Sequence, residues 1–188
     1  MNAESWRRLE DRALWLLEHA DQTPPVELLR GMGLQLRLWQ YPLTGPHHSW
    51  SIILPAREYR GRPAVIREVA WDQDVDWKLS MSPVKRLKRR QPVEPTVRVR
   101  DAEVAWFDLA PFFDAAGGLP TARLGEDPLV GSEEDAFGLE GARSLAHIRL
   151  RWVGKGPHGW GSTVAWFGRF RRLLVRVMHE RDLEARES

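Results

Sequence analysis

Apolar residues recur every three or four positions near both ends of the chain, which is the spacing of one face of an α-helix. The first such segment runs from Ser5 to about Ala20, and the second from Thr163 to Glu184. The second segment carries the apolar stripe Val164, Phe167, Phe170, Leu173, Leu174, Val177 and Met178, with Arg169, Arg172 and Arg176 on the opposite face. We therefore expect an N-terminal helix and a long amphipathic C-terminal helix.

Extended segments lie between these two helices. Leu34, Leu36 and Leu38 alternate with other residues, and strands are also predicted over residues 49–54, 64–71, 96–100 and 144–153. The segment 96–100 alternates valine with arginine, which is typical of a strand at the edge of a sheet. A short helix is expected over 108–116. Together these patterns predict an α+β protein with an antiparallel sheet of about five strands, on which the N-terminal helix and the long C-terminal helix pack.

Two long segments show neither the three-to-four-residue spacing of a helix nor the alternation of a strand. Residues 82–95 form a basic connector interrupted by prolines, and residues 119–138 form an acidic loop. A loop as long as the second is uncommon inside a compact domain, and its presence favours a functional role. A chain of 188 residues is the ordinary size of one domain, so residues 1–188 are expected to form a single domain.

The overall composition excludes several classes of protein. The chain has no cysteine, which excludes disulfides, thiol nucleophiles and cysteine-ligated metal centres. No stretch approaches the roughly 18 consecutive apolar residues of a membrane span. The first twelve residues are rich in charge and lack the apolar core of a signal peptide. We expect a cytoplasmic protein that does not enter membranes and needs no cofactor.

Tryptophan and arginine are both over-represented. The chain has ten tryptophans, and arginine supplies most of the 28 basic residues. The arginine excess is typical of a GC-rich genome, or of a surface that binds anions through bidentate contacts. Tryptophan is enriched at protein interfaces. Trp15, Trp39 and Trp160 are therefore candidates for contact with a protein partner.

The basic connector is the candidate for nucleic-acid binding. Its run of cations continues into the following strand and comprises Lys85, Arg86, Lys88, Arg89, Arg90, Arg98 and Arg100. Such a run can neutralise phosphates and gives binding that weakens as salt rises. However, the formal net charge of the whole chain is only +2, and no nucleic-acid-binding motif is present.

Alternating carboxylates follow the strand at 64–71 and form the only candidate metal site in the sequence. Asp72, Asp74 and Asp76 would lie on one face of an extended segment, with Glu68 as a further ligand. Asp76-Trp77-Lys78 also has the carboxylate–spacer–lysine form of metal-dependent nucleases. Matches of three residues are common by chance, so these four acids are weak candidates, and the alternative is a solvated turn.

The glycine-rich segment 154–163 connects the last strand to the last helix. Its glycines could hold an anion at the helix N-terminus, but the lysine that a phosphate loop carries immediately before Ser or Thr is missing. The simpler interpretation is a turn that caps the helix. Because no coherent catalytic set is visible, we expect a non-catalytic interaction module, an accessory subunit or inhibitor that contacts another protein. The alternatives are a nucleic-acid-binding protein and, third, a metal-dependent nuclease.

Overall fold

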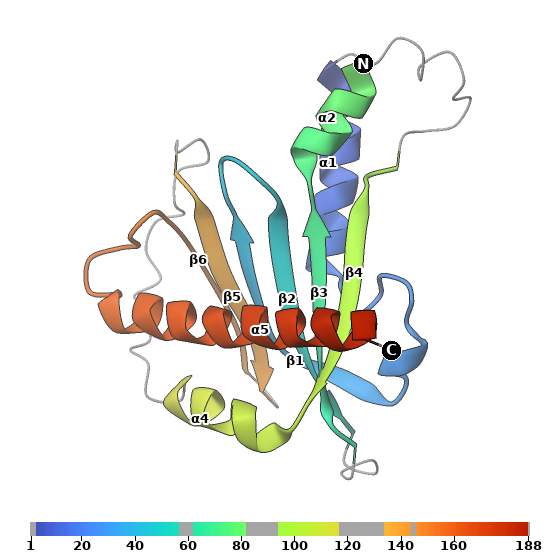
Figure 1. Ribbon diagram of the computed structural model, residues 1–188. Helices are drawn as coiled ribbons and strands as arrows, with labels where there is room; N and C mark the ends of the chain where they lie inside the picture. The colour runs from blue at the N-terminus through green and yellow to red at the C-terminus, as the bar shows by residue number, and fades with distance from the viewer. Residues whose placement is uncertain (1–2, 57–61, 82–93, 117–133, 144–145, 188) are drawn as a thin grey trace.

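A six-stranded antiparallel sheet in the order β4-β3-β2-β1-β5-β6 forms the centre of the molecule (Figure 1). The structure is a computed structural model that describes residues 3–56, 62–81, 94–116, 134–143 and 146–187. Its strands are β1 (Met32–Tyr41), β2 (His47–Pro55), β3 (Ala64–Trp71), β4 (Val97–Val104), β5 (Ala136–Arg143) and β6 (Ala146–Val153). Its helices are α1 (Ala3–Glu18), the 3-10 turn η1 (Glu27–Leu29), α2 (Gln73–Met81), α4 (Trp106–Ala116) and α5 (Gly161–Glu187).

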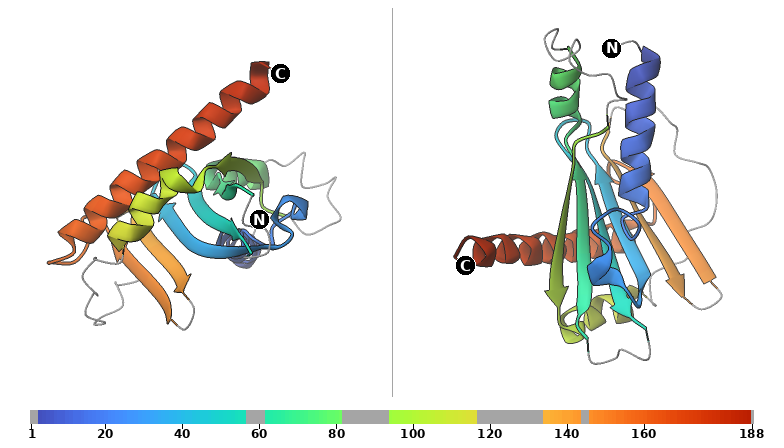
Figure 2. Two further views of the ribbon diagram at one scale, coloured as in Figure 1. Left: turned by 90° about the horizontal axis from the view of Figure 1, so that it is seen from below. Right: turned by 90° about the vertical axis from the view of Figure 1, so that its right-hand side faces the viewer.

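The helices form a layer on each face of the sheet, which confirms the predicted α+β architecture. The long helix α5 runs across the strands with α4 beside it, and α1 packs on the opposite face (Figures 1 and 2). The predicted stripe of α5 supplies its buried side, with Phe170 and Leu174 fully enclosed against the sheet. None of the described helices is long and apolar enough to cross a membrane.

The sheet has one strand more than the sequence pattern predicted. β5 occupies 136–143, where the expected acidic loop overlapped its first residues; the rest of that loop, up to residue 133, lies outside the described residues. The strand was missed because it contains two glycines, which are depleted in strands. Gly138 is required by packing, since a Cβ there would lie 2.0 Å from Cζ2 of its cross-strand neighbour Trp39.

Two further boundaries differ from the prediction. The carboxylate segment after β3 is helix α2 rather than an extended segment or a turn, because Oδ1 of Asp72 accepts hydrogen bonds from the backbone N–H groups of Asp74 and Val75 and caps the helix. β4 lies at the edge of the sheet as predicted, but it continues to Val104 instead of turning after residue 100.

A row of polar side chains crosses all six strands on the face that carries α1. In register, the row consists of Arg149, Glu140, Arg37, Ser51, Arg67 and Asp101. Arg37 and Arg67 are buried, and each pairs with a carboxylate, Glu140 and Asp101 respectively. The row lies beside the apolar cluster that α1 forms with Val69 and Trp71. Because Arg37 and Arg67 are buried, this part of the α1 face depends on charge compensation.

Within this row, Arg67 also binds the backbone of the segment that follows α1. Its side chain is fully buried, and Nε and Nη2 donate to the two carboxylate oxygens of Asp101 at 2.7 Å. The remaining donors reach the backbone carbonyls of residues 20, 23 and 25. Arginine has five N–H donors, and here five acceptors face them. The segment between α1 and η1 is therefore fixed to the sheet by one side chain.

Candidate functional site

The carboxylates that the sequence suggested as metal ligands serve the fold instead. Asp72 caps α2, and Asp74 is exposed. Asp76 is buried and accepts hydrogen bonds from Nε1 of Trp71 at 2.8 Å and from the backbone N and Oγ1 of Thr96 at 2.7 Å. Within the described part of the chain, no three His, Asp or Glu side chains are grouped to hold a metal ion. The four weak candidates, Glu68, Asp72, Asp74 and Asp76, are therefore not grouped as a metal site.

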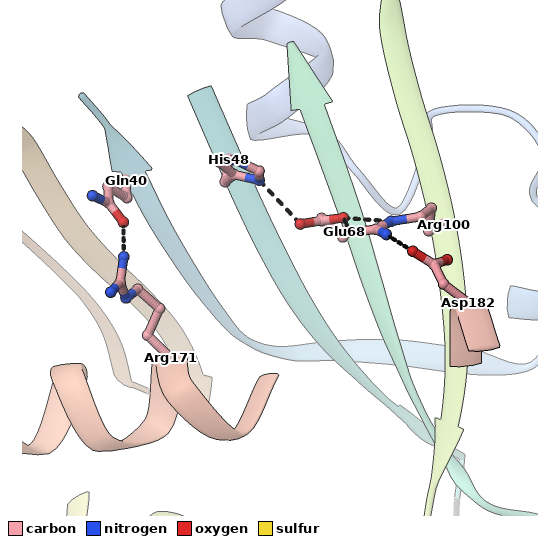
Figure 3. A network of polar contacts seen from close by, with 6 residues as sticks. All are labelled: Gln40, His48, Glu68, Arg100, Arg171 and Asp182. Carbon is pink, nitrogen blue, oxygen red and sulfur yellow. Dashed lines mark hydrogen bonds and ion pairs between the residues drawn. The ribbon is translucent and has the colours of Figure 1, made fainter. Parts of the chain in front are cut away.

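Glu68 instead lies at the centre of a polar network on the α5 face of the sheet (Figure 3). His48 on β2 donates from Nδ1 to Glu68 Oε1 at 3.0 Å, and Arg100 on β4 donates from Nε to Oε2 at 2.7 Å. Arg100 also reaches Asp182 near the end of α5. The network thus connects three neighbouring strands with the last turns of the long helix.

The electrostatics of this network favour an ionised glutamate. Burial alone would raise the pKa of Glu68, but the hydrogen bonds from His48 and Arg100 outweigh that effect and lower the pKa below its ordinary value. The His48 ring is further fixed by stacking on Trp50, with the centroids 5.2 Å apart. A histidine oriented by a carboxylate can serve as a general base in other settings. Here the observed contacts serve to attach α5 to the sheet, because Arg100 bonds both Glu68 on β3 and Asp182 on α5.

A second polar contact in the same view joins α5 to β1. Arg171 donates from Nη1 to the amide oxygen of Gln40 (Figure 3). Among the described residues, no carboxylate lies within ion-pair distance of Arg171. Arg171 therefore differs from Arg37, Arg67 and Arg100, each of which has an acidic partner.

Two aromatic groups near the β1–β2 turn have shifted pKa values. Burial lowers the pKa of His47 from 6.5 to about 4. Within the described part of the chain, its buried Nδ1 finds no hydrogen-bond partner. Its ring stacks on Tyr41 at 4.9 Å and meets Trp71 edge-on. Burial also raises the pKa of the Tyr41 hydroxyl. Both side chains therefore stay uncharged at neutral pH and belong to the core under α1.

The tryptophans proposed as partner contacts differ in exposure. Trp39 is only 3% exposed and lies against the guanidinium groups of Arg37 and Arg149, which removes it from the surface and corrects its assignment. Trp160 is half-buried and packs edge-on against Trp152 at 6.0 Å. Trp15 alone of the three has a large exposed area, stacked on His19.

The proposed nucleic-acid residues divide between the described and the undescribed parts of the chain. Lys85, Arg86, Lys88, Arg89 and Arg90 lie outside the described residues. Arg98 is exposed on β4. Arg100 is engaged by Glu68 and Asp182, so its charge is compensated within the fold.

An exposed aromatic pair at the start of α4 was not among the partner contacts that the sequence suggested. Trp106 is 46% exposed and Phe107 75% exposed, although Leu109 on the same helix is fully buried. In the same stretch of sequence, Glu103, Asp108 and Asp114 are exposed, and residues 101–116 contain no lysine or arginine. We call Trp106, Phe107 and these three acids the acidic aromatic surface. An adjacent Trp-Phe pair followed by Asp was its only signal in the sequence.

Comparison of the chain with protein-family models, with curated proteins and with solved structures finds no match.

Proposed function

We propose that this protein is a non-catalytic interaction module that binds another protein through the acidic aromatic surface. The exposure of Trp106 and Phe107 carries this proposal. Adjacent large aromatic side chains that remain in water resemble the centre of a protein interface, where aromatic residues are enriched and a polar rim surrounds them. Tryptophan is also among the residues that contribute most binding energy when an interface forms.

The acidic residues of this surface support a partner of opposite charge. Glu103, Asp108 and Asp114 give the rim a negative sign, in a chain whose net charge is slightly positive. A complementary partner presents an apolar pocket bordered by lysine or arginine. Opposite charges at the rim steer association and mainly raise its rate, while the aromatic centre determines how long the complex lasts.

The experiment begins with a photo-crosslinking amino acid of benzophenone type in place of Phe107, introduced in the cells that make the protein. Val175, exposed on α5, is the matched control position. We expect a crosslinked protein at position 107 that is absent at position 175. Equal crosslinking at both positions, or none at 107, would contradict the proposal.

The captured protein then allows an affinity measurement with purified components. Phe107→Ser and Trp106→Ser should each weaken binding by about 2 kcal/mol, or roughly 30-fold in Kd. Trp15→Ser is the matched control, because it removes an exposed tryptophan on the opposite face of the sheet. An unchanged Kd for both α4 variants, or an equal loss for Trp15→Ser, would refute the assignment of the surface.

Nucleic-acid binding remains the second candidate because α5 exposes a basic stripe. Arg169, Arg172 and Arg176 are all exposed along one side of this helix. If three phosphates are contacted, replacing all three arginines with alanine should reduce the log–log salt slope of duplex binding by about 3 between roughly 50 and 200 mM salt. The variant Arg7→Ala/Arg8→Ala on α1 is the control. No duplex binding at the lower salt would reject this candidate.

A further inference from the structure

A small pocket lies between α5 and the strands β1, β5 and β6. Its volume is about 190 Å³, and its walls include Phe137, Trp152, Phe167, Gly168, Gln40 and Arg171. The Trp152 ring contacts both phenyl rings, with centroids 6.1 Å from Phe137 and 5.0 Å from Phe167. The pocket therefore has an aromatic lining, with a guanidinium and an amide as its polar groups.

Gly168 keeps this pocket open. It occupies the interior of a 27-residue helix, where glycine is among the least favourable residues. The nearest atom to a Cβ built there is Nη1 of Arg172 at 3.8 Å, so no close backbone approach requires a glycine. Because Gly168 lines the pocket, any longer side chain would compete with a ligand for the same space.

Arg171 brings to the pocket a positive charge for which the described residues supply no carboxylate partner. It is half-buried, and its described partner is the neutral amide of Gln40. The other arginines enclosed by this sheet, Arg37, Arg67 and Arg100, are each paired with carboxylates. A partly desolvated guanidinium favours a planar carboxylate, which can accept two parallel hydrogen bonds.

We propose that the pocket binds a small aromatic carboxylate, which is a function beyond the protein interface of α4. The ring would pack against Phe137, Trp152 and Phe167, and the carboxylate would accept hydrogen bonds from Arg171. An apolar cavity of about 150 Å³ suffices for benzene in another protein, so the present volume admits a single ring with its carboxylate at the polar end. The Gln40 amide can turn to donate its N–H to the same carboxylate.

The test uses benzoate as the probe, with benzamide as its uncharged counterpart and acetate as a carboxylate without a ring. Binding is followed by ¹H–¹⁵N NMR of the full chain, read at the backbone amides of Gly154 and Gly168, which both line the pocket. A ligand of this size is expected to bind with Kd of roughly 1–10 mM. We expect benzoate to shift both amides and to bind more tightly than benzamide or acetate. Equal binding of benzoate and benzamide, or no shift at these amides, would overturn the proposal.

Two variants locate the site. Arg171→Gln should weaken benzoate binding by roughly 10- to 100-fold, since it removes hydrogen bonds to a charged group. Arg181→Gln removes the same charge from an exposed arginine further along α5 and should leave Kd within twofold. Gly168→Leu should abolish binding by filling the pocket, with the melting temperature confirming its fold. If the two glutamine variants change the Kd for benzoate equally, binding depends on net charge alone, and this pocket is not the benzoate site.

Discussion

Replacing Arg67 should reveal how far the buried polar row holds the α1 face together. In Arg67→Ala, the carboxylate of Asp101 loses its partner and the carbonyls of residues 20, 23 and 25 lose their donor. Removing one member of a buried ion pair costs about 3–5 kcal/mol. The Asp101 side chain is still 16% exposed, so water can replace part of the lost interaction. We therefore expect the lower half of that range.

Arg67→Lys separates the charge from the geometry of the guanidinium. Lysine keeps the positive charge but has three donors where arginine has five, so some of the acceptors lose their hydrogen bond. We expect a loss of stability smaller than for Arg67→Ala and larger than for Arg98→Ala, whose side chain is exposed and should change stability by less than about 0.5 kcal/mol.

The assay is urea unfolding followed by far-ultraviolet circular dichroism, with the free energy of unfolding compared among the three variants. Equal stability of Arg67→Lys and the wild type would refute the role assigned to the five hydrogen bonds. If Arg67→Ala lowers the free energy of unfolding by less than about 1 kcal/mol, the polar row does not stabilise the fold as argued, because breaking a buried ion pair costs several times more. If the alanine variant does not fold, the lysine variant still decides the question.

Three further predictions concern the core. Because the folded-state pKa of His47 is depressed to about 4, the stability contributed by its neutral form should be lost as pH falls from 6.5 through 4, by up to about 3 kcal/mol, and urea unfolding of His47→Phe should show a smaller acid loss. Phe170→Ala should cost roughly 3–5 kcal/mol and lower Tm, whereas Arg172→Ala should leave Tm nearly unchanged; equal Tm values would contradict the assigned face of α5. Gly138→Ala should cost about 1–3 kcal/mol in urea unfolding because its methyl group meets Trp39, and a neutral result would show that the ring can move.

The helices and strands with a clear apolar period were predictable from the sequence. The stripe of α5 and the alternation of β1, β2 and β3 reflect burial of one or both faces, and burial dominates local preference. β5 and α2 were missed for opposite reasons. β5 carries glycines because Trp39 lies over Gly138, a contact between distant segments. α2 is nine residues long, begins at a local aspartate cap and exposes both Val75 and Trp77, so it has no apolar stripe to detect.

The buried arginines show a different limit of sequence reasoning. Arg67 falls in a strand whose neighbours are apolar, and its charge gives no sign of how it is compensated. Its acceptors come from Asp101 and from backbone carbonyls at residues 20–25, which approach it only after the sheet and α1 have assembled. The partners of a buried charge are thus set by the fold. For the same reason, a run of arginines and lysines in the sequence does not reveal which of these side chains face solvent.

The exposed pair on α4 provides a last prediction, because its replacement should affect binding to the partner strongly and stability only slightly. The chain buries Trp50, Trp71 and Trp152 almost completely, whereas Phe107 keeps 75% of its surface in water. A side chain this exposed gains little from the apolar burial that stabilises a core. Phe107→Ser should therefore change the free energy of unfolding by less than about 0.5 kcal/mol in urea titrations. A loss of several kcal/mol would show that Phe107 packs within its own chain, and the docking surface would have to be sought elsewhere. A neutral result, together with a 30-fold weaker Kd for the partner, separates a residue that binds from one that folds.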